Sequence, residues 1–161
     1  MALQPGVTAP AFTLLHKHAD GLDQVSLGEL LAANDHVVVL FFPLAFTSVC
    51  QDELCTITGG IDAYQSLGAT VVAISVDSPF AQEAFAKHAQ ISVPLLSDFN
   101  KETATAYDVL DATFLPDKLG FAGVAKRSAF VIGKDGTIKY SWSSDNPGNL
   151  PPFDEIKAAL N

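Results

Sequence analysis

Positive charge is scarce in this sequence. Nine Lys and Arg residues face eighteen Asp and Glu residues, which gives a formal net charge of −9 at pH 7. Nucleic acids and anionic membranes both attract basic protein surfaces. The charge balance therefore argues against nucleic acid and membrane as main partners of this protein.

Long apolar runs are scarce as well. The longest, VVVLFFPLAF over residues 37–46, is interrupted by Pro43 and falls short of the ~18 apolar residues that span a bilayer. The first residues, MALQPGVTAPAF, lack the charged and apolar regions of a signal peptide. We therefore expect a cytoplasmic protein. Its 161 residues, of which 48% are hydrophobic and 17% charged, fit one globular domain over 1–161.

Cysteine is limited to Cys50 and Cys55. A chain of this length buries roughly 70% of the surface that its unfolded form exposes, so it needs no disulfide for stability. In a reducing compartment, two nearby cysteines are more often catalytic or metal-binding than structural. The Cys-x4-Cys spacing does not match most zinc sites, and the sequence has neither a G-x-G-x-x-G motif nor a P-loop. We expect no metal and no nucleotide cofactor.

Hydrophobic patterns predict strands and helices that alternate along the chain. Strands are expected at residues 12–16, 36–43, 69–76 and 93–98 and in a hairpin over 127–142, and helices at 26–33, 47–67, 79–89, 101–110 and 151–160. Ser26 and Glu29 have the spacing of a capping box, in which each side chain binds the other's backbone N–H. Gly59 and Gly60 should weaken or kink the second helix. This order predicts an α/β fold similar to the thioredoxin fold, with a central mixed sheet flanked by helices and with N-terminal additions.

Cys50 lies about one turn into the predicted helix that follows the strand at 36–43. Only the thiolate is a good nucleophile, and a free cysteine is only a few per cent ionised at pH 7. The unpaired N–H groups of a helix N-terminus favour the anion, and a cation nearby would favour it further. Arg127 begins the late hairpin, where a thioredoxin-like sheet could place it beside the Cys50 helix. Its planar guanidinium is permanently charged and can bind two atoms at once.

Three more residues accompany Cys50. Thr47, one turn earlier, is expected to turn its hydroxyl toward the sulfur and could also cap the helix. Pro43 ends the strand and would shield the sulfur from bulk water. Glu53 is first interpreted as a solvated acid that complements the helix dipole.

Together these residues form a known pattern. PLAFTSVC at 43–50 matches the P-x-x-x-T-x-x-C signature of peroxiredoxins, and FFPLAFTSVCQDEL resembles the alkyl hydroperoxide reductase E group. The resemblance extends to GVTAPAFTL, AISVDSP, VPLLSDF and RSAFVIGKDGTIKY, and so covers nearly the whole chain. It implies a thiol-dependent peroxidase that reduces hydrogen peroxide or small organic hydroperoxides without metal, haem or flavin.

The resemblance also implies a role for each residue of the pattern. Cys50 would attack the O–O bond and become a sulfenic acid. Thr47 and Arg127 would orient the peroxide and stabilise charge as the bond breaks. Pro43 would shape the pocket. Glu53 matches an acidic position common in this part of the family, where it would bind Arg127 or assist proton transfer.

Cys55 departs from the one-cysteine form of the reductase E group. It matches the peroxiredoxin Q, or bacterioferritin-comigratory, group, in which the second cysteine resolves the sulfenic acid as an intramolecular disulfide. Residues five apart on an intact helix rise ~7.5 Å and point well apart, whereas a disulfide needs Cα atoms within ~7 Å. We therefore expect the first turns of this helix to unwind on oxidation. The alternatives are that Cys55 is an inert buried residue, or that an external thiol resolves Cys50.

Two other functions use the same fold or the same cysteine. A thiol–disulfide oxidoreductase would carry C-x-x-C, which this chain lacks. A non-enzymatic redox sensor or holdase would react once at Cys50 and then wait for a partner. For the peroxidase, the expected reductant is thioredoxin or a glutaredoxin-type protein. The resemblance also implies a homodimer formed through the active-site loop.

Overall fold

The structure, a computed structural model, describes the whole chain from Met1 to Asn161. Its centre is a seven-stranded sheet with the strand order β2-β1-β5-β4-β3-β8-β9. The strands of this sheet are β1 (Thr13–His18), β2 (Gly21–Ser26), β3 (His36–Phe41), β4 (Ala69–Ser75), β5 (Leu95–Ser97), β8 (Ser128–Gly133) and β9 (Ile138–Ser143). β3 is parallel to β4 and β4 is parallel to β5, whereas the other neighbours are antiparallel. This mixed sheet confirms the predicted α/β class.

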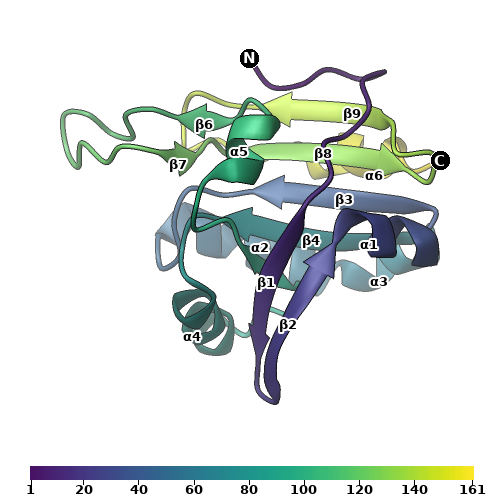
Figure 1. Cartoon of the computed structure of the whole chain (residues 1–161), viewed down its shortest axis with the longest axis horizontal. Coiled ribbons are helices and arrows are strands. Elements are labelled where there is room, and N and C mark those ends of the chain that lie inside the picture. Colours follow the sequence, from purple (N-terminus) through teal and green to yellow (C-terminus); the bar gives the residue numbers. More distant parts are fainter.

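Helices cover both faces of the sheet (Figure 1). They are α1 (Leu27–Ala33), α2 (Ser48–Gly59), α3 (Ile61–Ser66), α4 (Pro79–Ala89), α5 (Glu102–Ala106) and α6 (Phe153–Ala158). One buried cluster joins α2, α3, α4 and α6 to one face, and a second cluster joins α1 and α5 to the other. The helix that carries both cysteines, α2, therefore packs on the same face as α4.

The central strand β3 fixes the position from which the chain enters α2. Its residues Val37 to Phe41 are fully buried, as an uninterrupted apolar sequence predicts for a strand covered on both faces. Val38 and Leu40 belong to the α2 cluster, and Val37 and Val39 to the opposite one. All six residues of β3 pair with both β4 and β8. The loop to α2 thus starts from a strand held on both sides.

The expected helix over 47–67 is divided where the glycines predicted a weakness. α2 ends at Gly59, and α3 begins at Ile61 after Gly60, which has non-helical φ and ψ values of −110° and 12°. A glycine pair costs a helix more backbone entropy than other residues do, so the chain turns there rather than continuing.

The expected helix over 101–110 is shorter in the structure, where α5 ends at Ala106. Asp108 takes a left-handed conformation with a φ of 56°, which a continuing α-helix does not contain. The chain then forms β6 (Leu110–Asp111), which pairs with β7 (Val124–Ala125) outside the main sheet. Strands of two residues carry too little pattern to be predicted.

The N-terminal region holds one further strand than expected. β2 pairs along its whole length with β1, and its last residue, Ser26, lies opposite Thr13. The predicted capping box forms only in half. Ser26 Oγ accepts from the backbone N–H of Glu29 at 3.2 Å, without the reciprocal bond from the Glu29 carboxylate to Ser26.

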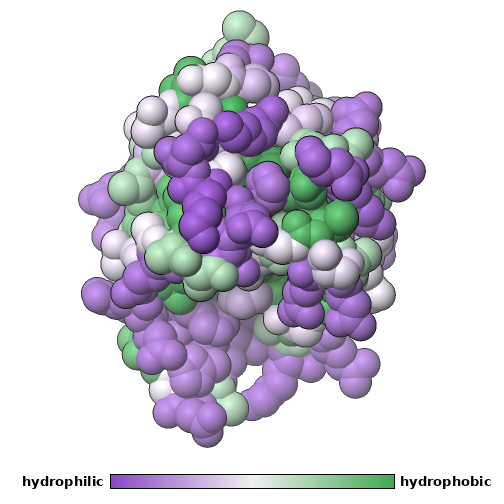
Figure 2. Space-filling model, turned by 90° about the vertical axis from the view of Figure 1, so that its right-hand side faces the viewer, coloured by the Kyte–Doolittle hydropathy of each residue, from purple (hydrophilic) through white to green (hydrophobic).

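One end of the molecule has a mainly polar surface. Figure 2 shows the end opposite to β6 and β7, which is mainly hydrophilic, with apolar residues in small separate groups. None of the helices combines the length and the apolar composition needed to cross a membrane.

Candidate active site

Cys50 is the third residue of α2, directly after the loop of residues 42–47 that links β3 to this helix. Thr47 occupies the N-cap, so the backbone N–H of Cys50 is one of those at a helix start that have no partner within the helix. The Cys50 side chain is fully buried. This is the place that the sequence predicted for it.

Sheet pairing brings Arg127 to the start of α2. In the β3–β8 pair, Phe41 at the end of β3 lies opposite Ser128 at the start of β8. Arg127 directly precedes Ser128 and therefore lies beside the loop that leads into α2. It reaches Cys50 across 77 residues of sequence.

The Arg127 guanidinium makes three hydrogen bonds. Its Nη2 donates to Cys50 Sγ at 3.1 Å, and its Nη1 donates to Glu53 Oε2 at 2.5 Å. Its Nε donates to the carbonyl oxygen of Pro147 at 3.1 Å. All three nitrogen atoms are engaged, so the orientation of the cation is fixed. The contact with Cys50 agrees with the prediction, whereas the sequence had given no reason to single out Pro147.

Glu53 is buried and not solvated, which corrects the first interpretation of this residue. It follows Cys50 by three residues, so both side chains lie on the same side of α2. Burial raises the pKa of Glu53 to about 7, although the Arg127 guanidinium acts against this rise. The second carboxylate oxygen, Oε1, has no hydrogen-bond partner. A carboxyl group with such a pKa can hold or release a proton near neutral pH.

The charge of Arg127 is maintained by its neighbours. Burial alone would lower the pKa of Arg127, but Glu53 and Cys50 outweigh burial and raise this pKa above its ordinary value. The guanidinium therefore stays protonated throughout the pH range in which proteins are studied. It is a permanent cation in hydrogen-bond contact with the Cys50 sulfur.

Thr47 and Pro43 line a cavity of about 160 Å³ that also contacts Cys50 and Arg127. The Thr47 hydroxyl donates to the carbonyl oxygen of Leu44 at 2.8 Å. Its single proton is used within the loop, so it does not donate to the sulfur as the sequence suggested. Its side chain also makes no cap bond to α2. The lone pairs of this hydroxyl remain able to accept a hydrogen bond inside the cavity.

The remaining lining of the cavity is mainly apolar. Phe114, Leu115 and Leu119, from the segment between β6 and β7, contribute to it together with Val49 and Pro147. Sequence reasoning missed these residues, because they lie far from the Cys50 motif. Leu115 has a φ of 47°, which is rare for a non-glycine residue. The apolar residues clustered in FLPDKLGF were the available signal.

Cys55 shares α2 with Cys50 but has different surroundings. Both thiols are free, and Cys55 is exposed where Cys50 is buried. Its Sγ donates to the carbonyl oxygen of Ala89, at the end of α4, at 3.5 Å. Exposure rules out the interpretation of Cys55 as an inert buried residue. Because α2 is one continuous helix, the structure corresponds to the state before any disulfide forms.

Comparison with known proteins decides the family. The model of the AhpC/TSA family matches residues 5–141, which is most of the chain. The chain belongs to the AhpC/TSA family. It is a peroxiredoxin, and thus a thiol-dependent peroxidase, as the motif at 43–50 predicted.

Relatives and solved structures of peroxiredoxins agree with this assignment. Alkyl hydroperoxide reductase E of Mycobacterium bovis is 33% identical over 150 residues, which cover 92% of this chain and 90% of that protein. The chloroplastic 2-cysteine peroxiredoxin of Chattonella marina var. antiqua is 30% identical over 148 residues, or 88% of this chain and 71% of that protein. The crystal structure of peroxidoxin BcpB from Mycobacterium tuberculosis matches with a TM-score of 0.82 and 28% identity, over 98% of this chain and 96% of that one. The thioredoxin-like fold of the peroxiredoxins is thereby confirmed.

Proposed function

We propose that this peroxiredoxin reduces hydrogen peroxide and small organic hydroperoxides with the Cys50 thiolate as the attacking group. The triple engagement of Arg127, which holds Cys50 Sγ and Glu53 side by side, supports this most strongly. A fixed guanidinium stabilises negative charge on the sulfur before the reaction and on the departing oxygen during it. We assign Glu53 to holding Arg127 in place, the first of the two roles expected for it.

In the proposed reaction, the Cys50 thiolate attacks the terminal oxygen of the hydroperoxide. The S–O bond forms as the O–O bond breaks, and the electron pair of the broken bond leaves on the other oxygen. That oxygen takes up a proton and departs as water or an alcohol, and Cys50 retains the transferred hydroxyl as a sulfenic acid. Thr47 accepts a hydrogen bond from the O–H of the bound hydroperoxide and so orients it for attack.

The apolar cavity supports organic hydroperoxides as substrates. A water molecule takes about 30 Å³ in the liquid, so hydrogen peroxide fills only part of the 160 Å³ cavity. An alkyl group would contact Phe114, Leu115 and Leu119, and each buried CH₂ group contributes about 0.8 kcal/mol. We therefore propose that cumene hydroperoxide reacts with a higher kcat/KM than hydrogen peroxide does.

Replacing a lining leucine tests this substrate range. Leu119→Ala should lower kcat/KM for cumene hydroperoxide by about tenfold and leave hydrogen peroxide little affected, because the change removes the contact with the alkyl group without adding a charge to the cavity. Leu22→Ala is a matched control, since Leu22 on β2 is 46% exposed and Leu119 is 47% exposed. Equal losses for both peroxides, or none, would contradict the proposed preference.

Cys55 is proposed as the resolving cysteine. Its thiol would attack the Cys50 sulfenic sulfur, release water and leave a Cys50–Cys55 disulfide. An intact helix separates residues five apart by ~7.5 Å along its axis and points them in different directions. The first turns of α2 must therefore unwind, and the bond from Cys55 to Ala89 must break. Faster amide exchange over 48–58 in the oxidised protein than in the reduced protein would be the direct sign of this.

One measurement separates the possible outcomes of oxidation. The reduced protein is mixed with one equivalent of hydrogen peroxide, and its intact mass and free thiols are then measured. A loss of two hydrogens with both thiols consumed supports the Cys50–Cys55 disulfide. A gain of one oxygen with Cys55 still titratable supports a one-cysteine enzyme resolved by an external thiol. No rapid change would refute Cys50 as the attacking group.

The remaining expectations concern partners. We propose thioredoxin or a glutaredoxin-type protein as the thiol donor, in a reducing compartment such as the cytoplasm. Turnover with this donor distinguishes the enzyme from a sensor that reacts once. We also propose a homodimer through the active-site loop, which is supported by Phe46 of that loop, 55% exposed despite its apolar ring. Light scattering of the reduced protein measures the oligomeric state.

A further inference from the structure

The loop of residues 42–47 must hold Pro43 and Thr47 in place over the Cys50 sulfur, yet it is not a relaxed segment. Phe46 has a φ of 64°, in the left-handed region that residues other than glycine seldom occupy. Such a conformation persists only where the surroundings hold it. The groups that hold this loop are therefore candidates for a part in the reaction.

One of these groups is the carboxylate of Asp77. Asp77 lies just after β4, and its Oδ2 accepts from the backbone N–H of Ala45, next to Phe46, at 2.8 Å. This is a charge-assisted hydrogen bond, which is stronger than one between neutral groups. It fastens the middle of the loop, two residues before Thr47. The Phe46 ring contributes a second contact, because it packs against Phe85 of α4 with ring centroids 5.1 Å apart.

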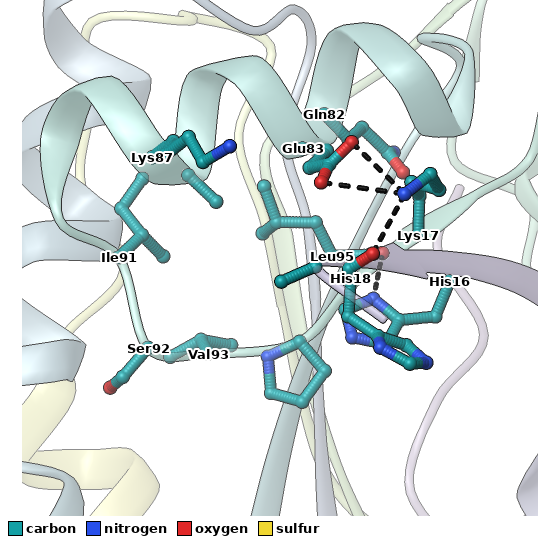
Figure 3. A pocket seen from close by; sticks show the side chains of 13 residues that line it. His16, Lys17, His18, Gln82, Glu83, Lys87, Ile91, Ser92, Val93 and Leu95 are labelled. Atoms are coloured by element: carbon teal, nitrogen blue, oxygen red, sulfur yellow. Dashed lines mark hydrogen bonds and ion pairs between the residues drawn. The ribbon is translucent and has the colours of Figure 1, made fainter. Parts of the chain in front are cut away.

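Asp77 is itself held by the core. Ser75 Oγ donates to Asp77 Oδ2 at 2.7 Å, and Ser97 Oγ of β5 donates to the Asp77 carbonyl oxygen at 2.7 Å. Gln82 of α4 donates through Nε2 to Ser75 Oγ at 2.9 Å and to the Leu96 carbonyl oxygen at 2.8 Å. The Gln82 side chain is 1% exposed, and Figure 3 shows it leaving α4 as one of the residues that line the cavity between this helix and β1. A continuous series of hydrogen bonds thus joins β4, β5 and α4 to the loop.

We propose that Asp77 is a positioning residue for the peroxidase reaction, which acts through Ala45 to keep Thr47 aligned with Cys50. The proposal rests on the proposed function of Cys50 and adds to it a residue outside the motif. Asp77 does not line the cavity, so it does not touch the substrate. Its effect is therefore on alignment, and a misplacement of about 1 Å at a reacting group can cost 100-fold in rate.

Two substitutions separate the hydrogen bond from the charge. Asp77→Ala removes the acceptor of the Ala45 N–H, and we expect kcat/KM for hydrogen peroxide to fall about 10- to 100-fold. Asp77→Asn removes the same charge but keeps an oxygen at the position of Oδ2, so its rate should stay within about threefold of the wild type. The rate is measured as the loss of the Cys50 thiol in the first oxidation, which is independent of any reductant.

A second reagent shows whether the loss is specific to alignment. Iodoacetamide alkylates thiols without a peroxide held by Thr47, and peptide mass mapping separates Cys50 from the exposed Cys55. The alkylation rate at Cys50 should be similar in the wild type and both variants. Asp20→Ala is the control for surface charge, because Asp20 is exposed in the turn between β1 and β2. It should leave both rates unchanged. Ser75→Ala removes the donor to Asp77 Oδ2 and tests the same series if Asp77→Ala does not fold.

The outcomes are distinct from those of the proposed function. A slow peroxide reaction with normal alkylation in Asp77→Ala, restored in Asp77→Asn, supports the proposal. A wild-type peroxide rate in Asp77→Ala, or in Ser75→Ala when only that variant folds, overturns it. Equal losses in Asp77→Ala and Asp77→Asn overturn it as well, because they assign the effect to charge. Failure of the proposed function would appear in the wild type itself, as a Cys50 that does not react rapidly with peroxide.

Discussion

Cys50 and Cys55 lie on one helix, five residues apart, but in opposite surroundings. Cys50 is fully buried and accepts a hydrogen bond from a cation, next to a buried carboxyl group. Cys55 is exposed, and its Sγ contacts only a neutral backbone carbonyl among the polar groups of the chain. The buried side of α2 therefore holds Cys50 and Glu53 against a cation, whereas Cys55 lies on an ordinary exposed helix surface.

This difference shows how the two thiols can serve different steps. An attacking thiol needs a cation that favours its anion and stabilises the transition state. A resolving thiol needs access and freedom to move. The buried start of α2 places Cys50 beside the cation, and its exposed side leaves Cys55 accessible. One helix can therefore support both the attack on the peroxide and the resolution of the sulfenic acid.

The largest expected effect comes from replacing the two thiols themselves, one at a time. Cys50→Ser should reduce peroxide consumption to the uncatalysed background, because the attacking sulfur is gone. Cys55→Ser should leave the rate of the first oxidation unchanged. Both rates are measured by stopped-flow consumption of hydrogen peroxide. A Cys50→Ser variant that still consumes peroxide, or a Cys55→Ser variant that does not react, would show that the surroundings do not distinguish the two thiols.

The second-largest effect on activity is expected from removing the Arg127 cation. Arg127→Met should lower kcat/KM for hydrogen peroxide by about 10²- to 10³-fold, as expected when a positioned charge is lost from a transition state. It should also destabilise the fold, because the buried Glu53 loses its hydrogen-bond partner and is then held protonated at neutral pH.

The double variant Arg127→Met/Glu53→Gln separates these two effects. It should regain most of the stability in urea unfolding but none of the activity. Recovery of activity in the double variant would mean that Arg127→Met acted through the fold alone.

Cys55→Ser should have a smaller, later effect on the cycle. The first oxidation proceeds, but the Cys50 sulfenic acid then persists and is converted to the sulfinic acid by further peroxide. Intact mass should show one added oxygen with one equivalent of peroxide and a second with excess peroxide. The wild type should instead stop at the disulfide. Identical products from both proteins would indicate that Cys55 takes no part in resolution.

The smallest expected effect concerns stability and pH. Because burial raises the pKa of Glu53 from 4.5 to about 7, the folded protein binds this proton more tightly than the unfolded protein does. The stabilising contribution is complete below pH 4.5 and is lost as the pH rises through 7, by at most about 3 kcal/mol.

Urea unfolding at pH 5 and pH 8 measures this effect. The wild type should lose stability relative to Glu53→Gln as the pH rises. Glu29→Gln, at an exposed position of α1, is the matched control and should not change the pH dependence. If the free energy of unfolding changes equally between pH 5 and pH 8 in the wild type and in Glu53→Gln, the pKa of Glu53 is not raised.

Local motifs predicted the start of α2 well. The burial of individual side chains, which depends on segments far away in the sequence, was harder to predict. The spacing of Pro43, Thr47 and Cys50 specified the loop and the helix start. Glu53 was misjudged because its closeness to the helix start suggested exposure. The buried positions Cys50, Glu53, Leu54 and Ile57 show the i, i+3, i+4, i+7 spacing of an inward-facing stripe. That spacing was the signal in the sequence that Glu53 is buried.

Other features depended on partners that no local pattern reveals. The end of α5 is set by the left-handed Asp108, and the bond from Arg127 to Pro147 joins segments of irregular structure. The role proposed for Asp77 depends on a contact across 32 residues of sequence. Strand order was sufficient to bring Arg127 near Cys50, because sheet pairing follows from hydrophobic pattern more directly than loop contacts do.

The three hydrogen-bond acceptors of Arg127 have a consequence for how quickly the reduced active site forms again after each reaction. When Cys50 leaves to form a disulfide, the guanidinium loses that acceptor, and Glu53 lies between the two cysteines, in the segment that unwinds. The carbonyl oxygen of Pro147 lies outside α2 and still binds Arg127 Nε, so the cation stays beside the loop while the helix is open. After reduction, only a few residues have to rewind, which helices do within about 1 μs. The delay between one peroxide and the next would then be set by the encounter with the reducing thiol, and the enzyme's recovery would scale with the concentration of that thiol.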